Sequence, residues 1–339
     1  MKVQFYQSKD EGLSINLLFG IIKENFPVSL NFSTVYFTYT GPSIPARIYD
    51  VFAGFFQSQK QINHVIGDFN YATFLMPKSR TILTIHDLYR LYVHQASRSK
   101  VFIFKWFWLK IPLSKCSVVT TISQCTKNEI IKYSGCRDDK IRVIYNCISP
   151  DFAPIPKSFN KEKPVLLQIG TRINKNVERL VRAIEGISCK LFIVGKPSRV
   201  TMELLEHNKV DYSWESQLSR KQIIEQYANC DMLVFVSTFE GFGMPIVEAN
   251  AIERAVVTSN ISAMPEIAGG AACLVDPFDV ASIRQGILRV IEDDTYRQKL
   301  IDEGKKNRQR FEARNIAEQY YNLYLEIYQH DTLSKITKN

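Results

Sequence analysis

The stretch that decides the fold is DMLVFVSTFEGFGMPIVEAN, residues 231–250. Its apolar run up to Ser237 has the composition of a strand covered on both faces in a parallel sheet. Gly241 and Gly243 then allow a tight turn and the close approach of a ligand to the backbone. Pro245 follows in the expected first turn of a helix, where its missing N–H removes no hydrogen bond. The stretch therefore predicts a strand, a glycine turn and a helix start in direct succession.

Two glutamates flank this turn. Glu240 precedes it at the strand end, and Glu248 stands about one turn into the expected helix. The free N–H groups and positive dipole end of that helix form a site for phosphate. The spacing fits one extended anionic ligand, with an acid at its sugar end, amides on its phosphates and an acid on its ribose. For Glu248 the alternative is simple stabilisation of the helix dipole. The dinucleotide fingerprint G-x-G-x-x-G fails at Ile246.

Strand-like and helix-like patterns alternate along the rest of the chain. We expect strands in the first half at 2–6, 34–39, 62–67, 81–87, 117–123 and 141–146, and in the second half at 164–170, 190–195, 231–237, 255–260 and 272–277. We expect helices at 14–25, 123–133, 279–292, 295–309 and 312–329. Ser219 and Gln222 fit a capping box that opens a further helix.

A proline-rich segment without periodicity divides the chain. Residues 147–164 carry four prolines and are typical of an interdomain linker. We place the domains at 1–150 and 164–310, with the linker at 151–163 and a C-terminal helix at 311–339 that packs back towards the first domain. The alternation on both sides predicts an α/β protein with two doubly wound, Rossmann-like domains that face each other across a cleft. Ligands of such folds bind beyond the carboxyl ends of the strands.

Composition restricts the class of protein. The 339 residues are 45% hydrophobic and 23% charged, as in soluble globular proteins. No run approaches the length of a membrane-spanning helix, and the first apolar run breaks at Gln7, too early for a signal peptide. Seven scattered cysteines without a CxxC pair are typical of reduced thiols in a cytosolic protein and offer no metal site. The net charge of +9 favours anionic partners, but no nucleic-acid-binding module is present.

The stretch 231–250 resembles the E-x7-E motif of retaining glycosyltransferases with the GT-B fold, specifically glycosyltransferase family 4. SNISAMPEIAGGAACLVDP (259–277) continues the resemblance in the order and spacing of that family's C-terminal domain. LLQIGTRINKNVERLVRAI (166–184) resembles its phosphate-binding segment. TILTIHDLYRL (81–91) and VVTTISQCTKNEI (118–130) look like parts of its N-terminal, acceptor-side domain.

The resemblance implies a donor site around the glycine turn. It places Glu240 against the donor sugar and Glu248 on the nucleotide ribose. It implies that backbone amides of the turn hold the diphosphate, namely those of Gly241, Phe242, Gly243 and Met244. It also implies that a basic pair, Lys175 and Arg172, stabilises the charge that develops on the leaving diphosphate. For both basic residues the alternative is solvated loop charge, and the loop is about one residue shorter than the commoner form of the family.

The resemblance also implies site residues in the first half. His86 follows an expected strand, and the family has a histidine here near the donor sugar. A structural histidine bonded to the backbone is the alternative. Asp87 either orients His86 or interacts with the acceptor. The loop 10–13, with Gly12, takes the place of a glycine-rich loop that meets the donor phosphate or the acceptor.

The implied reaction is transfer of a sugar from a nucleotide-diphosphate donor to an acceptor hydroxyl, with retention at the anomeric carbon. No D-x-D pair is present, so we expect neither a metal nor a cofactor. The resemblance implies a saccharide or lipid-linked saccharide acceptor in surface polysaccharide such as O-antigen, lipopolysaccharide or capsule. Similarity to polysaccharide mannosyltransferases favours GDP-mannose as donor. The alternatives are a nucleotide-sugar epimerase on the same fold and a non-catalytic sugar-nucleotide-binding module.

Residues 97–115, SRSKVFIFKWFWLKIPLSK, mix basic and aromatic side chains. A basic aromatic helix can lie on an anionic membrane surface. A core helix with snorkelling lysines is the alternative. We expect a cytoplasmic protein. If residues 97–115 lie on a membrane, we expect peripheral contact with the inner face of the cytoplasmic membrane.

Overall fold

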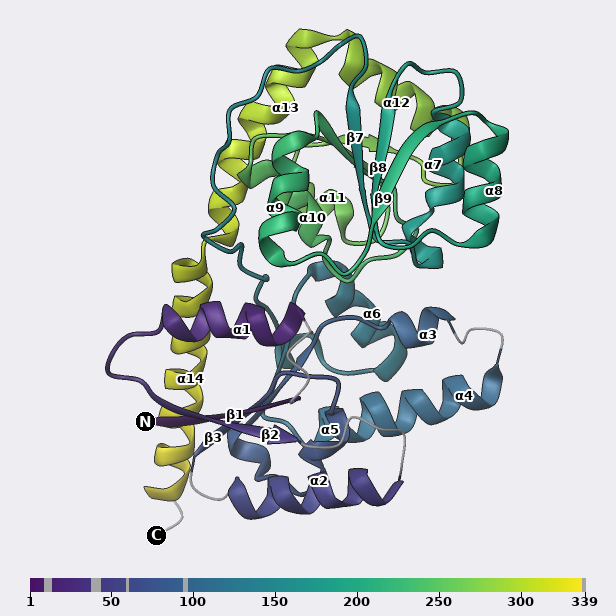
Figure 1. Ribbon diagram of the computed structural model, residues 1–339. Coiled ribbons are helices and arrows are strands. Elements are labelled where there is room, and N and C mark those ends of the chain that lie inside the picture. The colour runs from purple at the N-terminus through teal and green to yellow at the C-terminus, as the bar shows by residue number, and fades with distance from the viewer. Residues whose placement is uncertain (9–13, 38–43, 59–60, 94–96, 337–339) are drawn as a thin grey trace. The chain divides into compact units, whose positions relative to one another are not determined.

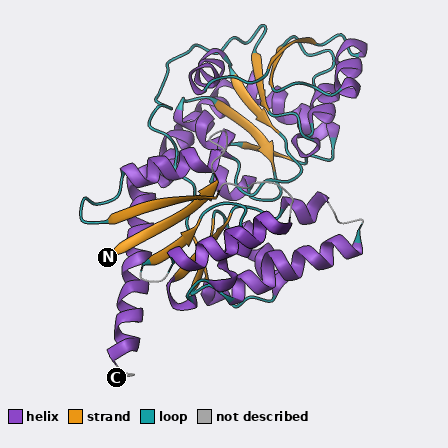
Figure 2. Ribbon diagram, turned by 60° about the horizontal axis from the view of Figure 1, so that its bottom comes forward, coloured by secondary structure: helices purple, strands orange, loops and turns teal. Residues whose placement is uncertain are grey.

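A computed structural model of the protein describes residues 1–8, 14–37, 44–58, 61–93 and 97–336 (Figure 1). The chain forms two compact units. Unit 1 contains residues 1–147 together with 313–339, and unit 2 contains residues 148–312. Each unit has a parallel sheet of six strands, so the expected α/β class is confirmed (Figure 2).

The sheet of unit 1 has the strand order β2-β1-β3-β4-β5-β6. Its strands are β1 (Lys2–Ser8), β2 (Asn31–Phe37), β3 (Ile62–Val65), β4 (Thr81–Ile85), β5 (Val118–Thr121) and β6 (Ile141–Val143). Its helices are α1 (Ser14–Glu24), α2 (Ile44–Gln57), α3 (Tyr89–Val93), α4 (Arg98–Ile103), α5 (Ile111–Ser114), α6 (Gln124–Ser134) and α14 (Ala313–Ile336). Short helical turns are η1 (Asn70–Leu75), η2 (Lys78–Arg80), the π-helical η3 (Phe104–Lys110) and η4 (Asp138–Lys140).

Two apolar layers cover the sheet of unit 1. One joins the strands to α1 and α14, with Phe5, Phe19 and Tyr324 among its buried side chains. The other joins them to η1, η3 and α5, with Leu83 and Leu109 among its buried side chains. The C-terminal helix α14 is therefore part of unit 1, although residues 148–312 separate it in sequence from the rest of the unit.

A buried histidine ties α14 to the sheet. His64 in β3 lies 2.8 Å from the hydroxyl of Tyr324 through Nδ1 and 2.7 Å from that of Thr84 through Nε2. Burial lowers the pKa of His64 well below its ordinary value, so the ring is neutral. Because both ring nitrogens have hydroxyl partners, the histidine is satisfied inside the core.

The sheet of unit 2 has the strand order β12-β11-β10-β7-β8-β9. Its strands are β7 (Val165–Ile169), β8 (Lys190–Val194), β9 (Asp211–Glu215), β10 (Met232–Phe235), β11 (Ala255–Ser259) and β12 (Cys273–Val275). Its helices are α7 (Val177–Ala183), α8 (Arg199–His207), α9 (Arg220–Asn229), α10 (Met244–Ala251), α11 (Met264–Ala268), α12 (Val280–Glu292) and α13 (Asp294–Asn307), with short turns at η5 (Ile173–Lys175) and η6 (Arg308–Phe311). Both halves of the capping box expected at Ser219 and Gln222 are present.

The segment expected as a linker packs on unit 2. The buried carboxylate of Asp231 accepts hydrogen bonds from the backbone N–H groups of Asn160 and Val165, at 3.0 and 2.8 Å, and from Lys157. The guanidinium of Arg254 donates to the carbonyl oxygen of Ile155 at 2.8 Å. Residues 155–165 are thus held by buried polar groups, and the division of the chain falls at 147/148 rather than within 151–163.

One strand escaped the sequence analysis. β9, with the sequence DYSWE, lies at the edge of the sheet and pairs only with β8. An edge strand needs few apolar side chains, so its polar composition hid it.

Candidate active site

The strand order of unit 2 reverses between β7 and β10. From β7 the sheet continues to β8 and β9 on one side, and to β10, β11 and β12 on the other. In doubly wound sheets ligands bind at this reversal, just beyond the carboxyl ends of the two strands. The loop after β7 carries Lys175, and the loop after β10 carries Glu240. The topology therefore brings the two expected site segments together.

Lys175 and Glu240 form an ion pair at this reversal. The Nζ of Lys175 lies 2.7 Å from Oε1 of Glu240, and the two side chains are only 17% and 15% exposed. Asn174 donates a second hydrogen bond to the same oxygen at 3.3 Å. The ammonium group also lies 4.6 Å from the centre of the Phe235 ring. A cation and a carboxylate are thus held side by side, half-buried, where an anionic ligand is expected.

Gly170 leaves space for the side chain of Lys175 to pass close to the backbone. Gly170, at the end of β7, has a φ of +85°, and a Cβ atom there would lie 3.1 Å from Cε of Lys175. A larger residue at 170 would therefore be strained in its backbone and would also push the lysine side chain aside.

The backbone around Glu240 is fixed by residues that the sequence analysis did not select. Its N–H donates to Oγ of Ser262 at 3.2 Å, and the hydroxyl of Ser262 donates to its carbonyl oxygen at 2.7 Å. Asn174 donates to the carbonyl of Phe239 at 2.9 Å. Asn174 directly precedes the selected Lys175, so its position was a usable signal. Ser262 lies 22 residues after Glu240, and no local pattern marked it.

The turn after Glu240 has the expected form. Gly243 has a φ of +110° and precedes α10, whose first turn contains Pro245 and has no side-chain cap. The side chain of Phe242 is 4% exposed and packs edge-on against Phe311 at 5.6 Å. The ring of Phe242 therefore packs inside unit 2. Met244, the first residue of α10, is half-buried.

Glu248 lies on α10 with one of its two carboxylate oxygens occupied. The hydroxyl of Tyr227 in α9 donates to Oε2 at 2.7 Å. Burial raises the pKa of Glu248, and the hydrogen bond from Tyr227 opposes that rise. Tyr227 itself is fully buried, with Phe152 edge-on at 5.7 Å. The geometry is that of an oriented carboxylate, which goes beyond simple stabilisation of the helix dipole.

Arg172 is not brought to the ion pair. It precedes η5, and its side chain is exposed and forms no ion pair with a described residue. The two basic residues expected to act together thus have different surroundings: Lys175 is fixed, whereas Arg172 points to solvent.

His86 and Asp87 follow β4 in unit 1. The Nε2 of His86 lies 2.9 Å from the carbonyl oxygen of Ile66. Because a carbonyl only accepts, Nε2 carries the proton and Nδ1 is the acceptor of the neutral ring. Burial lowers the pKa of His86, so the ring stays neutral near pH 7. Asp87 is exposed and accepts from the N–H of Tyr89 at 2.9 Å, at the start of α3. Gly12 lies outside the described residues.

Glu129 is a further acid near Asp87 that the sequence analysis missed. It lies on α6, and burial together with the charge of Asp87 raises its pKa to about 7. The motif VVTTISQCTKNEI contained it, but nothing in that pattern distinguishes a half-buried glutamate from a solvated one.

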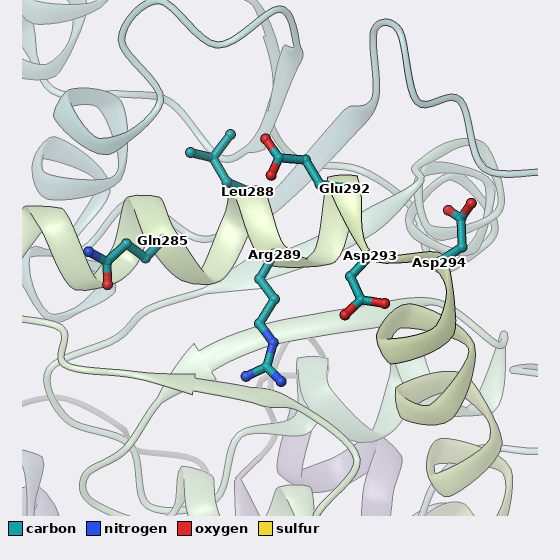
Figure 3. A pocket seen from close by; sticks show the side chains of 6 residues that line it. All are labelled: Gln285, Leu288, Arg289, Glu292, Asp293 and Asp294. Atoms are coloured by element: carbon teal, nitrogen blue, oxygen red, sulfur yellow. The ribbon is translucent and has the colours of Figure 1, made fainter.

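Further hollows of unit 2 are lined by residues other than those at the strand reversal, and one of them lies between residues 157–159 and α13. Figure 3 shows a hollow at the junction of α12 and α13, where Leu288 and Glu292 lie on one side of the helix and Arg289 and Asp293 on the other. These side chains do not converge on a common point. Among the described residues no group of three metal-ligating side chains occurs, and no described helix is long and apolar enough to cross a membrane.

Two family models match adjoining parts of the chain. The model for glycosyl transferases group 1 matches residues 151–307, and the model for glycosyltransferase family 4 matches residues 40–152. Together they span most of the chain. The chain belongs to the family 4 type of glycosyltransferases. These matches confirm the resemblance to glycosyltransferase family 4 that the sequence indicated.

Two curated relatives of this glycosyltransferase are named as O-antigen chain mannosyltransferases. The chain is 28% identical over 236 residues to O-antigen chain mannosyltransferase B of Escherichia coli, covering 62% of this chain and 61% of that protein. It is 29% identical over 218 residues to O-antigen chain mannosyltransferase RfbU of Salmonella typhimurium, covering 61% and 60%. The match thus spans about three fifths of the length of these relatives.

Solved structures show the same fold for the glycosyltransferase. The Anabaena protein Alr3699/HepE, solved in complex with UDP and glucose, has a TM-score of 0.74 at 16% identity and covers 96% of this chain and 100% of its own. Sucrose-phosphate synthase of Thermosynechococcus elongatus has a TM-score of 0.77 at 16% identity, covering 97% and 100%. The two parallel sheets are therefore those of a GT-B fold, as expected from the sequence.

Proposed function

We propose that this glycosyltransferase moves a sugar from a nucleotide-diphosphate donor to a saccharide or lipid-linked saccharide acceptor in O-antigen or related surface polysaccharide assembly. The observation that carries the proposal is the Lys175–Glu240 ion pair at the strand reversal, directly before the uncapped start of α10. A phosphate at that helix start meets backbone N–H groups and the positive end of the helix. The mannosyltransferase names of the relatives support mannose, and we propose GDP-mannose as donor.

We further propose that the transfer retains the anomeric configuration and needs no metal. In this reaction the bond between the anomeric carbon and the leaving phosphate oxygen breaks, and the acceptor oxygen bonds to that carbon from the same face. The acceptor proton passes to the leaving diphosphate. Lys175 supplies the positive charge that a metal would otherwise provide, with Arg172 as its exposed partner. Glu240 and His86 hold the donor sugar, and Asp87 contacts the acceptor.

We assign the nucleotide ribose to Glu248. The carboxylate accepts hydrogen bonds from the ribose hydroxyls, and Tyr227 fixes its orientation through Oε2. An epimerase or a binding module would also need this contact, but neither would need the acceptor-side residues. The relatives' names favour transfer over both alternatives.

The proposal also includes peripheral contact of residues 97–115 with an anionic membrane. Four of their large apolar side chains are exposed, namely Phe102, Ile103, Trp106 and Phe107. Exposure of these side chains supports a surface role over a core role for this part of the segment.

The ribose assignment predicts a specific pH dependence of nucleotide binding. Only the ionised carboxylate accepts both ribose hydroxyls, and burial raises the pKa of Glu248 above the ordinary value of 4.5. Affinity for the nucleoside diphosphate should therefore fall as pH decreases through that raised pKa, beginning at a higher pH than for an ordinary glutamate. Tyr227→Phe removes the hydrogen bond that opposes the rise, so it should move the fall to still higher pH. Isothermal titration calorimetry over a pH series that extends from neutral pH to below 4.5, the ordinary pKa of a glutamate, compares the two midpoints.

Two results contradict this assignment. One is a pH midpoint of binding that Tyr227→Phe leaves unchanged, because the hydrogen bond from Tyr227 would then have no effect on the protonation of Glu248. The other is a Glu248→Gln variant that keeps the acid-dependent loss of affinity, because another group would then be responsible.

Thermal unfolding against a panel of nucleotides tests the proposed donor. We expect GDP and GDP-mannose to raise the midpoint in the presence of EDTA, and UDP, ADP and dTDP to do so much less. Ligand at a hundred times its dissociation constant adds roughly 2.7 kcal/mol of stability. A larger shift with UDP would replace the guanine assignment, and no shift with any nucleotide in EDTA would contradict the metal-free donor site.

A further inference from the structure

The segment that carries Glu240 from β10 to the glycine turn has no regular secondary structure of its own. β10 ends at Phe235, and residues 236–240 belong to no helix or strand. They are nevertheless buried or half-buried. Because an unpaired backbone N–H or C=O group is costly away from water, the hydrogen bonds of this segment have to come from other parts of unit 2. They come from the loops on its two sides.

The loop after β7 holds the middle of the segment. Asn176 donates through Nδ2 to the carbonyl oxygen of Val236 at 3.0 Å. The carbonyl oxygen of Asn174 accepts from the N–H of Thr238 at 2.8 Å, and its Nδ2 donates to the carbonyl oxygen of Phe239 at 2.9 Å. Two asparagines thus replace, on this side, the neighbouring strand that the segment lacks.

On the other side, three hydroxyl groups of β11 and the turn after it hold the segment. We call Thr258, Ser259 and Ser262 the hydroxyl ladder. Their hydroxyl groups donate to three carbonyl oxygens along the chain: Thr258 to that of Phe235 at 2.7 Å, Ser259 to that of Ser237 at 2.6 Å, and Ser262 to that of Glu240 at 2.7 Å. The last residue pair of β10 with β11 is Phe235 with Thr258. The hydroxyl ladder therefore begins where the pairing of the strands ends, and it reaches Glu240.

Ser262, at the outer end of the hydroxyl ladder, has a strained backbone. Its φ is +57°, in the left-handed region that a residue with a Cβ atom adopts at a cost. Its Oγ accepts from the N–H of Glu240 at 3.2 Å and donates to the carbonyl oxygen of the same residue at 2.7 Å. Glycine would adopt this φ without strain, but it has no hydroxyl group. Backbone strain that the surrounding structure maintains is concentrated at functional sites.

We propose that Ser262 is a positioning residue for Glu240, whose backbone it fixes at both polar groups so that the carboxylate is directed into the donor site. The carboxylate meets Lys175 at 2.7 Å and Asn174 at 3.3 Å through a single oxygen, Oε1. A rotation of the backbone at Glu240 would carry this oxygen away from both partners. The inference rests on the proposed role of Glu240 at the donor sugar. Ser262 itself acts only through Glu240.

Two substitutions at Ser262 separate positioning from structural support. Ser262→Gly loses both hydrogen bonds but relieves the strain, whereas Ser262→Ala loses the bonds and keeps the strain. We expect both to lower the maximal rate of mannose transfer from GDP-mannose, at a fixed amount of acceptor extract, by about tenfold or more. The KM for the donor should change little, because Glu248 and the glycine turn hold the nucleotide.

The unfolding midpoints of the two variants should differ although their rates agree. Ser262→Gly should unfold close to the wild type, because relief of strain offsets the lost hydrogen bonds, and Ser262→Ala should unfold at a lower temperature. If Ser262 only stabilised the fold, the rate would follow the midpoint. Wild-type transfer by Ser262→Gly would therefore overturn the proposal.

Hydrogen exchange at the amide of Glu240 provides a test that needs no substrate. Both variants should exchange this amide faster than the wild type, because its acceptor is gone. Lys209→Gly is the matched control: Lys209 has a φ of +48°, is exposed, and precedes β9 at the end of the strands opposite the site. It should leave both transfer and exchange at Glu240 at their wild-type values.

The exchange result also distinguishes this inference from the proposed function. A wild-type chain that transfers no sugar would contradict the proposed function alone. Faster exchange at Glu240 in both Ser262 variants would still support the positioning role, and unchanged exchange in them would overturn it.

Discussion

Glu240→Gln should lower sugar transfer by about a hundredfold or more, with little change in nucleotide affinity. The carboxylate accepts from both Lys175 and Asn174 at one oxygen, and its charge holds the lysine in place. A neutral amide keeps the size of the side chain but loses this charge, so the cation is no longer oriented towards the leaving diphosphate. Removing a preorganised electrostatic group of this kind costs about 10²–10³ in kcat.

The measurement combines initial rates with a nucleotide titration on the same preparation. Glu292→Gln is a matched control, because Glu292 lies exposed at the end of α12 in the same unit. Transfer by Glu240→Gln at the rate of this control would remove Glu240 from the site. Loss of nucleotide binding with loss of transfer would indicate that Glu240 maintains the turn instead of holding the sugar.

Arg254→Met should destabilise unit 2 by about 3–5 kcal/mol, because it leaves buried carbonyl groups without a donor. The guanidinium is 3% exposed and donates to the carbonyls of Cys230, Ile252 and Ala228 at 2.7–3.0 Å. It also holds Ile155 in the segment before β7. The acceptors at 228, 230 and 252 lie at the carboxyl ends of α9 and α10, where a cation also interacts favourably with the negative end of the helix dipole.

Differential scanning calorimetry should show a midpoint lower by about 10 °C for Arg254→Met, from about 2–4 °C per kcal/mol in a unit of this size. Arg284→Met is the control, because Arg284 also donates to two carbonyls but is only half-buried. The unfolding midpoint of Arg254→Lys should lie between those of Arg254→Met and the wild type, since an ammonium group cannot reproduce the fork of donors of a guanidinium. A midpoint for Arg254→Met equal to that of the control would contradict the assigned role.

Local sequence patterns predicted the described strands other than β9, and also the turn that follows β10. The run of strand, glycine turn and helix in 231–250 needs only nearest neighbours, so β10, the turn at Gly243 and the start of α10 follow from it. The strand alternation predicted the doubly wound class for the same reason. Lys175 and Glu240 were selected through the family motif, and their contact follows from the strand order, which brings the loops after β7 and β10 together.

Contacts between distant segments were beyond sequence analysis. Ser262 binds the backbone of Glu240, and Tyr227 binds Glu248 across 21 residues, yet neither residue type is unusual at its position. The attachment of 155–165 to unit 2 depends on Asp231 and Arg254, which bond across 66 to 99 residues. The exposure of apolar side chains on α2, such as Phe52 and Phe56, was missed because a row of apolar side chains at helical spacing ordinarily indicates burial.

The most direct test of the account is transfer of isotope-labelled sugar by the purified chain, in EDTA, from GDP-mannose and UDP-glucose to lipid and saccharide extracts of the source cells. The account predicts labelled product from GDP-mannose, release of GDP, and an anomeric configuration in the product equal to that of the donor by NMR. Transfer that needs a divalent metal, or a product with inverted configuration, would contradict the proposed chemistry. Binding of GDP-mannose without any labelled product would contradict the proposed transfer itself.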